Sequence, residues 1–180
     1  SKVLAICNTQ GSTIPREADA ALYTYAGPEI AVASTKAFLT QVVACYLVAL
    51  YLAQVRGNKY GDEIATIVNE LADMPGKVDL VLDTTEGVRE LAQEFADAPS
   101  VLFIGRHVGF PVALEGALKL KEISYIHAEG YAAGELKHGP IALIDESMPI
   151  VVLATGGDIQ DKMVSNIQEV HARGGKIIAF

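Results

Sequence analysis

The chain alternates short apolar runs with longer stretches in which apolar residues recur at helical spacing. Short apolar runs bounded by turn residues predict buried strands, whereas recurring apolar positions predict helices packed on one side. We expect strands at 3–7, 20–25, 101–105, 149–153 and 176–180, and helices at 35–55, 60–74, 80–95, 109–125 and 160–173. The stretches 8–16 and 127–140 are predicted to be loops, the second with a short helix. This alternation is typical of an α/β protein with a parallel sheet.

The helix predicted at 35–55 is apolar over most of its length. Residues 37–55 carry no charge and approach the roughly 20 residues that a membrane-spanning helix needs. Gln41 and Gln54 interrupt the apolar run, charges flank it directly, and no second such segment follows. A buried core or interface helix is therefore favoured over a membrane span, and no leader peptide is recognisable before the first strand.

Gly57 and Asn58 end this long helix and mark the expected division of the chain. We predict two α/β units, residues 1–57 and residues 58–180. Self-similarity between them is too weak to establish a repeat from the sequence.

Composition removes several classes of function. The formal net charge is −8, and no basic run exceeds two residues, so a nucleic-acid surface is not expected. A small anionic ligand remains compatible with the sequence if a few cations converge. Cys7 and Cys45 lack CxxC or metal-type spacing, which predicts buried free thiols in a reducing, cytoplasmic compartment and no metal site.

Three charged residues share one stripe of the helix predicted at 109–125. At about 100° per residue, Glu115, Lys119 and Glu122 fall on a narrow sector that is surrounded by apolar positions. A solvated ion-pair face explains this spacing. The alternative is an active site, because a carboxylate beside a lysine and away from bulk water can be tuned to move protons.

Two further segments carry candidate chemistry. His138 lies between glycines in a predicted tight loop, where it is either structural or an acid–base group that titrates near neutral pH. Ser34 and Thr35 precede the long helix, where they either cap its N-terminus or bind an oxygen-rich or anionic ligand. No GxGxxG or Walker motif is present, so a nucleotide site is not supported.

Several strings together resemble one family. These are AICN at 5–8, GPEI and VASTKAF within 27–38, FIGR at 103–106, ALEGALKLKEISYIHAE at 113–129 and GYAAGELKHGP at 130–140. They resemble the sugar isomerase (SIS) region of the glucosamine-6-phosphate synthases, or glutamine–fructose-6-phosphate aminotransferases. The resemblance implies two SIS subdomains, each a flavodoxin-like three-layer α/β/α sandwich with a parallel sheet. This chain would hold the end of the first and most of the second.

The resemblance also implies roles for individual residues. Glu122 matches the glutamate that moves a proton between C1 and C2 as fructose 6-phosphate becomes glucosamine 6-phosphate. Lys119 matches a lysine that assists proton movement at the C2 oxygen. His138 matches a histidine that helps to open the sugar ring from the neighbouring subunit of a homodimer, and Val32 and Ser34 match positions that line the sugar. No cofactor or metal is implied.

The chain departs from the family pattern in some respects. Ala31 stands where family members commonly have glycine. The family's phosphate-binding loop, its C-terminal lysine and its glutaminase domain have no counterpart here, so the resemblance implies that this stretch alone has no synthase turnover. Two alternatives remain open, namely a phosphosugar-sensing SIS module and another phosphosugar isomerase or deglycase.

Overall fold

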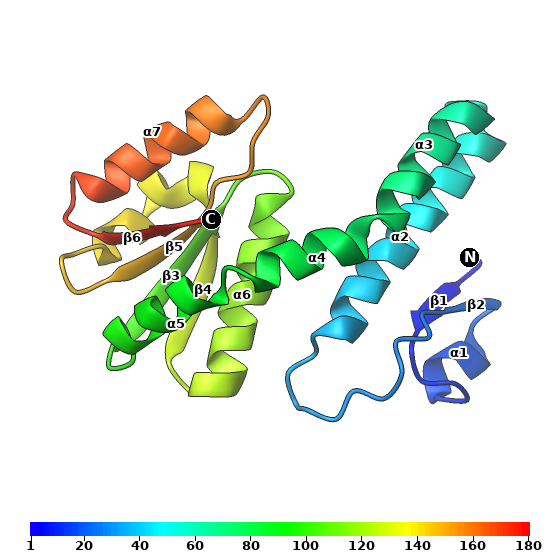
Figure 1. The fold of residues 1–180 in the computed structure, drawn as a ribbon, viewed down its shortest axis with the longest axis horizontal. Helices are drawn as coiled ribbons and strands as arrows, with labels where there is room; N and C mark the ends of the chain where they lie inside the picture. The colour runs from blue at the N-terminus through cyan, green and yellow to red at the C-terminus, as the bar shows by residue number, and fades with distance from the viewer. The chain divides into compact units, whose positions relative to one another are not determined.

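The computed structural model describes residues 1–180 and divides them into two compact units, 1–87 and 88–180 (Figure 1). The segment 58–87 clusters with the first unit, and the assignment of residues 58–180 to a second homologous unit stays a prediction.

The first unit contains a two-stranded parallel sheet. Strands β1 (Leu4–Cys7) and β2 (Ala20–Tyr23) pair from end to end, with Leu4 opposite Ala20. The short helix α1 (Thr13–Glu17) connects them within a stretch that we predicted to be a loop. Its Pro15 is buried against the unit, so packing stabilises one helical turn that no local pattern indicates.

Helices make up the rest of this unit. They are α2 (Lys36–Val55), α3 (Gly61–Ala72) and α4 (Met74–Leu82), and α5 (Thr85–Glu94) follows across the division between the units. The sequence predicted helices at 60–74 and 80–95, but a separate helix, α4, begins at Met74 and has Pro75 in its first turn. Proline is tolerated there since the first turn leaves its backbone N–H groups unpaired.

The second unit is built on a four-stranded parallel sheet with the order β4-β3-β5-β6. Its strands are β3 (Ser100–Gly105), β4 (His127–Ala132), β5 (Pro149–Leu153) and β6 (Lys176–Ala179). The helix α6 (Gly109–Ser124) connects β3 to β4, and α7 (Gln160–His171) connects β5 to β6. Two 3-10 helices, η1 (Ala133–His138) and η2 (Pro140–Leu143), follow β4.

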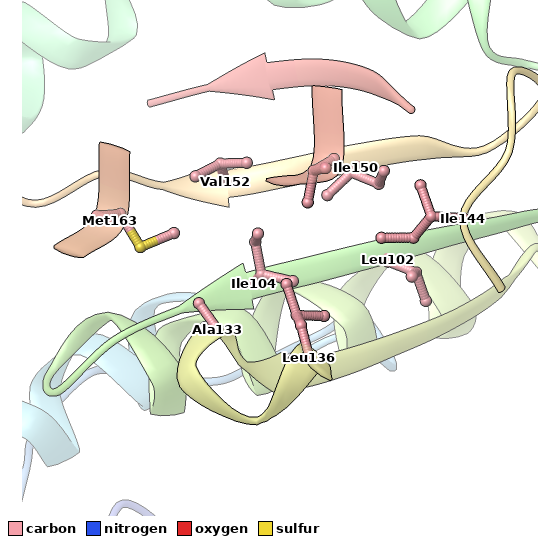
Figure 2. Close-up of a cluster of buried hydrophobic side chains, with 9 residues drawn as sticks. Leu102, Ile104, Ala133, Leu136, Ile144, Ile150, Val152 and Met163 are labelled. Carbon is pink, nitrogen blue, oxygen red and sulfur yellow. The ribbon is translucent and has the colours of Figure 1, made fainter. Parts of the chain in front are cut away.

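The two faces of this sheet carry different elements. On one face α6 packs so closely that a Cβ on Gly116 would lie 2.8 Å from the Phe103 ring. The neighbouring strand residues Leu102 and Ile104 point to the opposite face, because side chains alternate along a strand. There they join Leu136 of η1 in the main core (Figure 2). The core also contains Ala133, Ile144, Ile150, Val152, Met163 and Val170.

The prediction of a loop over 127–140 was wrong in its first half, since residues 127–132 form β4. This strand pairs with β3 over six residues, from Ser100 opposite His127 to Gly105 opposite Ala132. Its sequence, HAEGYA, lacks the apolar β-branched residues that mark a buried strand. The second half of the stretch forms the 3-10 helix η1, and a short helix was expected in this stretch.

Helix α2 exposes much of its apolar surface in the chain described here. Only Ala44 and Leu50 are buried, and Cys45, which we predicted to be buried, is exposed. By length and composition α2 is the one helix that could span a membrane, a test that the core helices of soluble proteins also pass. Its apolar side chains therefore need a covering surface, and the prediction of no membrane span stays a prediction.

Candidate active site

The predicted charged stripe exists on α6. The ammonium Nζ of Lys119 lies 2.5 Å from Oε2 of Glu122 and 3.5 Å from Oε1 of Glu115. All three side chains are about one-quarter exposed or less, between 20% and 26%. The helical spacing therefore brings one cation between two carboxylates, as the sequence predicted.

Lys119 is held in its charged form by this arrangement. The hydrogen bond to Glu122 raises the pKa of Lys119 above its ordinary value, and the charges of Glu122 and Glu115 act in the same direction. Desolvation acts against them but does not prevail. At neutral pH the site therefore presents an ammonium group in contact with carboxylate oxygens, a pair that can donate and accept protons at adjacent atoms.

The stripe lies on the side of α6 that faces away from the sheet. The sheet-facing side is formed by small buried residues such as Ala113 and Ala117. At about 100° per residue, Lys119 and its two partners lie roughly half a turn from them. The apolar side chains beside the stripe are exposed, namely Val112, Leu118 and Ile123. An ordinary solvated ion-pair face has polar neighbours, so this apolar rim indicates that another surface covers the stripe.

His138 does not lie beside Glu122 within this unit. It ends η1, whose Leu136 packs on the sheet face opposite to α6. Glu122 also precedes the start of β4, whereas His138 follows its end, and a six-residue strand spans roughly 20 Å. The imidazole is 74% exposed and its Nε2 lies 4.0 Å from Oε2 of Glu135, so it is accessible to a second molecule.

Val32 and Ser34 lie in the first unit, in the segment before α2. Val32 is exposed and Ser34 is half-buried. The expected side-chain cap from Ser34 or Thr35 is absent. Instead the Glu29 carboxylate accepts hydrogen bonds from the backbone N–H groups of Ala37 at 3.0 Å and Thr35 at 3.3 Å.

This capping carboxylate changes the interpretation of the helix N-terminus. The backbone N–H of Ala37 is the main cause that lowers the pKa of Glu29, which is therefore ionised at neutral pH. The N-terminus of α2 thus already binds an anion from its own chain, so the predicted affinity for an external anion there loses its support. The Glu29 role was missed because the residue precedes the helix by seven positions.

The Asn8 side chain holds the backbone between β2 and the segment before α2 by hydrogen bonds. The Asn8 side chain donates to the carbonyl of Gly27 at 2.6 Å and accepts from the backbone N–H of Ala26 at 2.8 Å. It also accepts a hydrogen bond from the hydroxyl of Thr24 at 3.1 Å. Asn8 therefore fixes the backbone that follows β2. This backbone leads into the segment that contains Val32 and Ser34.

One cavity of the second unit, about 480 Å³ in volume, is apolar. It lies between α5, α6 and the sheet, and α6 contributes Leu120 and Ser124 to its lining. Neither Lys119 nor Glu122 lines it. No group of three or more His, Cys, Asp or Glu side chains in residues 1–180 is arranged to hold a metal ion.

The fold and the matched sequence define the class. The model of the SIS domain family matches residues 1–51 and 94–180. The chain belongs to the SIS domain family.

More specific relatives are the glutamine–fructose-6-phosphate aminotransferases (isomerizing). Those of Streptomyces coelicolor and Corynebacterium glutamicum are 66% and 65% identical to this chain over its whole length. The chain spans about 30% of the length of these curated relatives. It aligns with the solved C-terminal domain of the Francisella tularensis glucosamine-fructose-6-phosphate aminotransferase at a TM-score of 0.95 and 47% identity, over 98% of this chain and 50% of that one.

Proposed function

We propose that the chain forms the isomerase region of a glutamine-dependent fructose-6-phosphate aminotransferase that makes glucosamine 6-phosphate. The observation that carries the proposal is the Lys119–Glu122 pair on α6, in a chain that is about two-thirds identical to such aminotransferases along its whole length. The two residues that the family resemblance names as the proton-transfer pair are in direct contact here.

The chemistry needs one base and one acid on a fixed support. Ammonia released from glutamine first replaces the C2 oxygen, which leaves as water, and an imine forms at C2 of the open-chain sugar. The Glu122 carboxylate then takes a proton from C1 and returns it to C2, while the proton of the C1 hydroxyl passes to the nitrogen, so that C1 becomes an aldehyde and C2 carries an amine. Lys119, kept protonated by Glu122, supplies the positive charge and the proton at the C2 oxygen as that oxygen leaves. Both groups lie on one helix, so their spacing is fixed before the substrate arrives. This exchange requires no metal or organic cofactor.

The remaining assignments concern the sugar and the partner subunit. Val32 and Ser34 line the sugar, and His138 assists ring opening in the site of the neighbouring subunit of a homodimer. The exposed position of His138, on the sheet face opposite to α6, supports a role in a second molecule. Further partners are the glutaminase domain of the same chain and the substrate fructose 6-phosphate. The protein acts in the cytoplasm, without nucleic acid or membrane.

The decisive experiment replaces the proposed base. In a chain as long as the aminotransferase relatives, Glu122→Gln should lower the rate of glucosamine 6-phosphate formation by about 10²–10⁴-fold, because the amide cannot accept the proton. Solvent deuterium incorporation at C1 and C2 should fall by the same factor. Binding of fructose 6-phosphate, followed by calorimetry, should change little, since the amide keeps the shape of the carboxyl group.

Glu94→Gln provides the matched control, because Glu94 is an exposed glutamate on α5 without an ion pair. It should leave both rate and binding unchanged. If the unmodified protein binds phosphosugars but neither turns them over nor exchanges hydrogen with solvent, the phosphosugar-sensing alternative is correct. If Glu122→Gln turns over at the normal rate, Glu122 is not the base.

A further inference from the structure

A second, smaller cavity in residues 88–180 has the opposite character to the apolar one. Its volume is about 210 Å³, and polar and charged side chains line it. They are Arg106, Lys137, Lys162, Ser165, Asn166 and Glu169. These side chains come from the segment after β3, from η1 and from α7.

Arg106 is held rigidly at this cavity. Its Nε donates a 2.8 Å hydrogen bond to Oδ1 of Asn166, which is itself only 4% exposed. The Asn166 amide donates to Glu169 at 3.3 Å, which fixes the direction of the amide group. A Cβ on Gly134 would lie 3.2 Å from Nη2 of Arg106, so the absence of a side chain there makes room for the guanidinium.

The terminal nitrogens of this guanidinium make no hydrogen bond within the chain. A fixed arginine with free Nη donors is the geometry that binds phosphate or carboxylate oxygens in pairs. Because the side chain is already ordered by Asn166, binding an anion costs little additional conformational entropy.

The charge around the cavity favours an anion as well. Three cations line it against one carboxylate, in a chain whose formal net charge is −8. Lys137 is paired with Glu169 at 2.8 Å, whereas Lys162 has no ion pair. Lys162 therefore adds a free charge to that of Arg106. The Ser165 hydroxyl donates only a long hydrogen bond of 3.5 Å to Oε1 of Glu169, and it can rotate to donate to an anion instead.

The position of the cavity in the fold also favours a ligand-binding site. The lining segments follow the carboxyl ends of β3, β4 and β5. The connection from β3 leads to one side of the sheet and the connection from β5 leads to the other, and ligands of parallel α/β sheets bind where the order reverses in this way. The volume admits a phosphoryl group with a small substituent but is below the roughly 300 Å³ at which typical sites for larger ligands begin.

We propose that this cavity is a phosphoryl-binding site, separate from the Lys119–Glu122 pair. Arg106 binds two oxygens of a phosphate or a small phosphate ester, and Lys162 and Ser165 bind the third. The site lies on the sheet face occupied by η1 and α7, opposite to α6, so the proposal does not rest on the function proposed above.

The test uses inorganic phosphate and glycerol 3-phosphate with the 180-residue chain at low ionic strength. Amide resonances of the segments around Arg106, Lys137 and Asn166 should shift in a saturable manner in ¹H–¹⁵N spectra. Arg106→Gln should weaken binding at least about tenfold, since a charged hydrogen-bond donor pair is lost. If the ester binds as well as free phosphate, the ligand is a phosphate ester; if only free phosphate binds, the ligand is inorganic phosphate.

Lys162→Gln keeps the test valid if Arg106→Gln disturbs folding, because Lys162 takes no part in the Arg106–Asn166 bond. It should weaken binding by roughly threefold or more, and Glu169→Gln should strengthen it, because a competing charge is removed. Lys121→Gln, at an exposed lysine of α6 without an ion pair, should have no effect. Equal phosphate affinity of the Lys162→Gln and Lys121→Gln chains, or no shift in these segments, would overturn the proposal.

Discussion

Lys119 forms ion pairs with two carboxylates on the outward face of α6. It contacts Glu122 directly and Glu115 at 3.5 Å, and the three groups shield one another from solvent. The net effect is a cation whose proton is held more tightly than in water. A proton-transfer pair built in this manner is ordered before any ligand arrives, which lowers the entropic cost of the reaction.

The raised pKa of Lys119 predicts a change of stability at alkaline pH. A group whose folded-state pKa lies above its unfolded value of about 10.4 stabilises the folded protein fully below that pH, and the contribution is lost as pH rises through the folded pKa. Lys119→Met should therefore destabilise the chain near neutral pH, and its difference from wild type in urea unfolding should shrink above about pH 11. Lys121→Met, which removes an exposed lysine without an ion pair, is the control. A pH-independent difference for Lys119→Met would contradict the assignment.

At this scale the sequence predicted contacts that helical spacing alone determines. Glu115, Lys119 and Glu122 met as expected because i, i+3 and i, i+4 positions are always neighbours on a helix. The cap of α2 was not predictable in the same way, because Glu29 reaches it through a loop whose path depends on tertiary structure. Arg106 and Asn166 are 60 positions apart, so no local pattern indicates their hydrogen bond.

Helix α6 and strand β4 fit together through a missing side chain. A Cβ on Gly130 of β4 would lie 2.9 Å from both the Cα and the backbone nitrogen of Leu114. Backbone atoms of a packed helix cannot move aside as a flexible side-chain end can. Gly130 therefore sets how closely α6 approaches the sheet, and with it the position of the Lys119–Glu122 pair.

We predict that Gly130→Ala destabilises the fold by about 1–3 kcal/mol, because the added methyl group forces α6 away from β4. The measurement is equilibrium unfolding in urea, followed by circular dichroism. Gly87→Ala is the matched control, since α5 has nothing within 4 Å of the added Cβ. It should stabilise the chain by roughly 0.5–1 kcal/mol through helix propensity. If both changes had the same sign, the close approach of α6 would not determine stability.

Gly130 also explains why strand β4 was not predicted from the sequence. Glycine and charged residues weaken the strand signal of HAEGYA, although pairing with β3 over six residues determines its structure. Strands with apolar runs, such as β3 and β5, were predicted within one residue of their observed bounds. The bounds of α4 and α5 were predicted less accurately, because Pro75 is equally compatible with the end of a helix and with its beginning.

For the molecule as a whole, the sequence predicted the class of fold better than its exposed surfaces. Alternating strands and helices require a parallel α/β arrangement, and the sheet order β4-β3-β5-β6 has that form. The sequence predicted a buried core or interface helix at 35–55, whereas α2 buries only Ala44 and Leu50, and the outer face of α6 also exposes apolar side chains. Exposed apolar surface of this extent is typical of chains that are covered by further protein, which agrees with the homodimer that we propose.

The position of His138 leads to a testable prediction about the proposed dimer. Within one chain, His138 lies on the sheet face opposite to α6 and at the other end of β4 from Glu122. If each active site takes Glu122 from one subunit and His138 from its partner, a mixed dimer of Glu122→Gln and His138→Ala chains contains one intact site. Co-expression of the two full-length variants in equal amounts should restore about one-quarter of wild-type activity, because half of the dimers are mixed and each has one working site of two.

The control for this experiment places both substitutions in one chain and co-expresses it with the wild-type chain. Every mixed dimer then carries one defective residue in each of its two sites, so only the wild-type homodimers stay active, which again amounts to about one-quarter of full activity. Each single variant expressed alone should stay inactive or strongly impaired, and light scattering should report dimers throughout. No recovery when the two single variants are combined would mean that His138 and Glu122 do not serve one site across the subunit interface. That result would leave the proton-transfer role of Glu122 to be judged by its own substitution, since the Lys119–Glu122 contact is made within one helix.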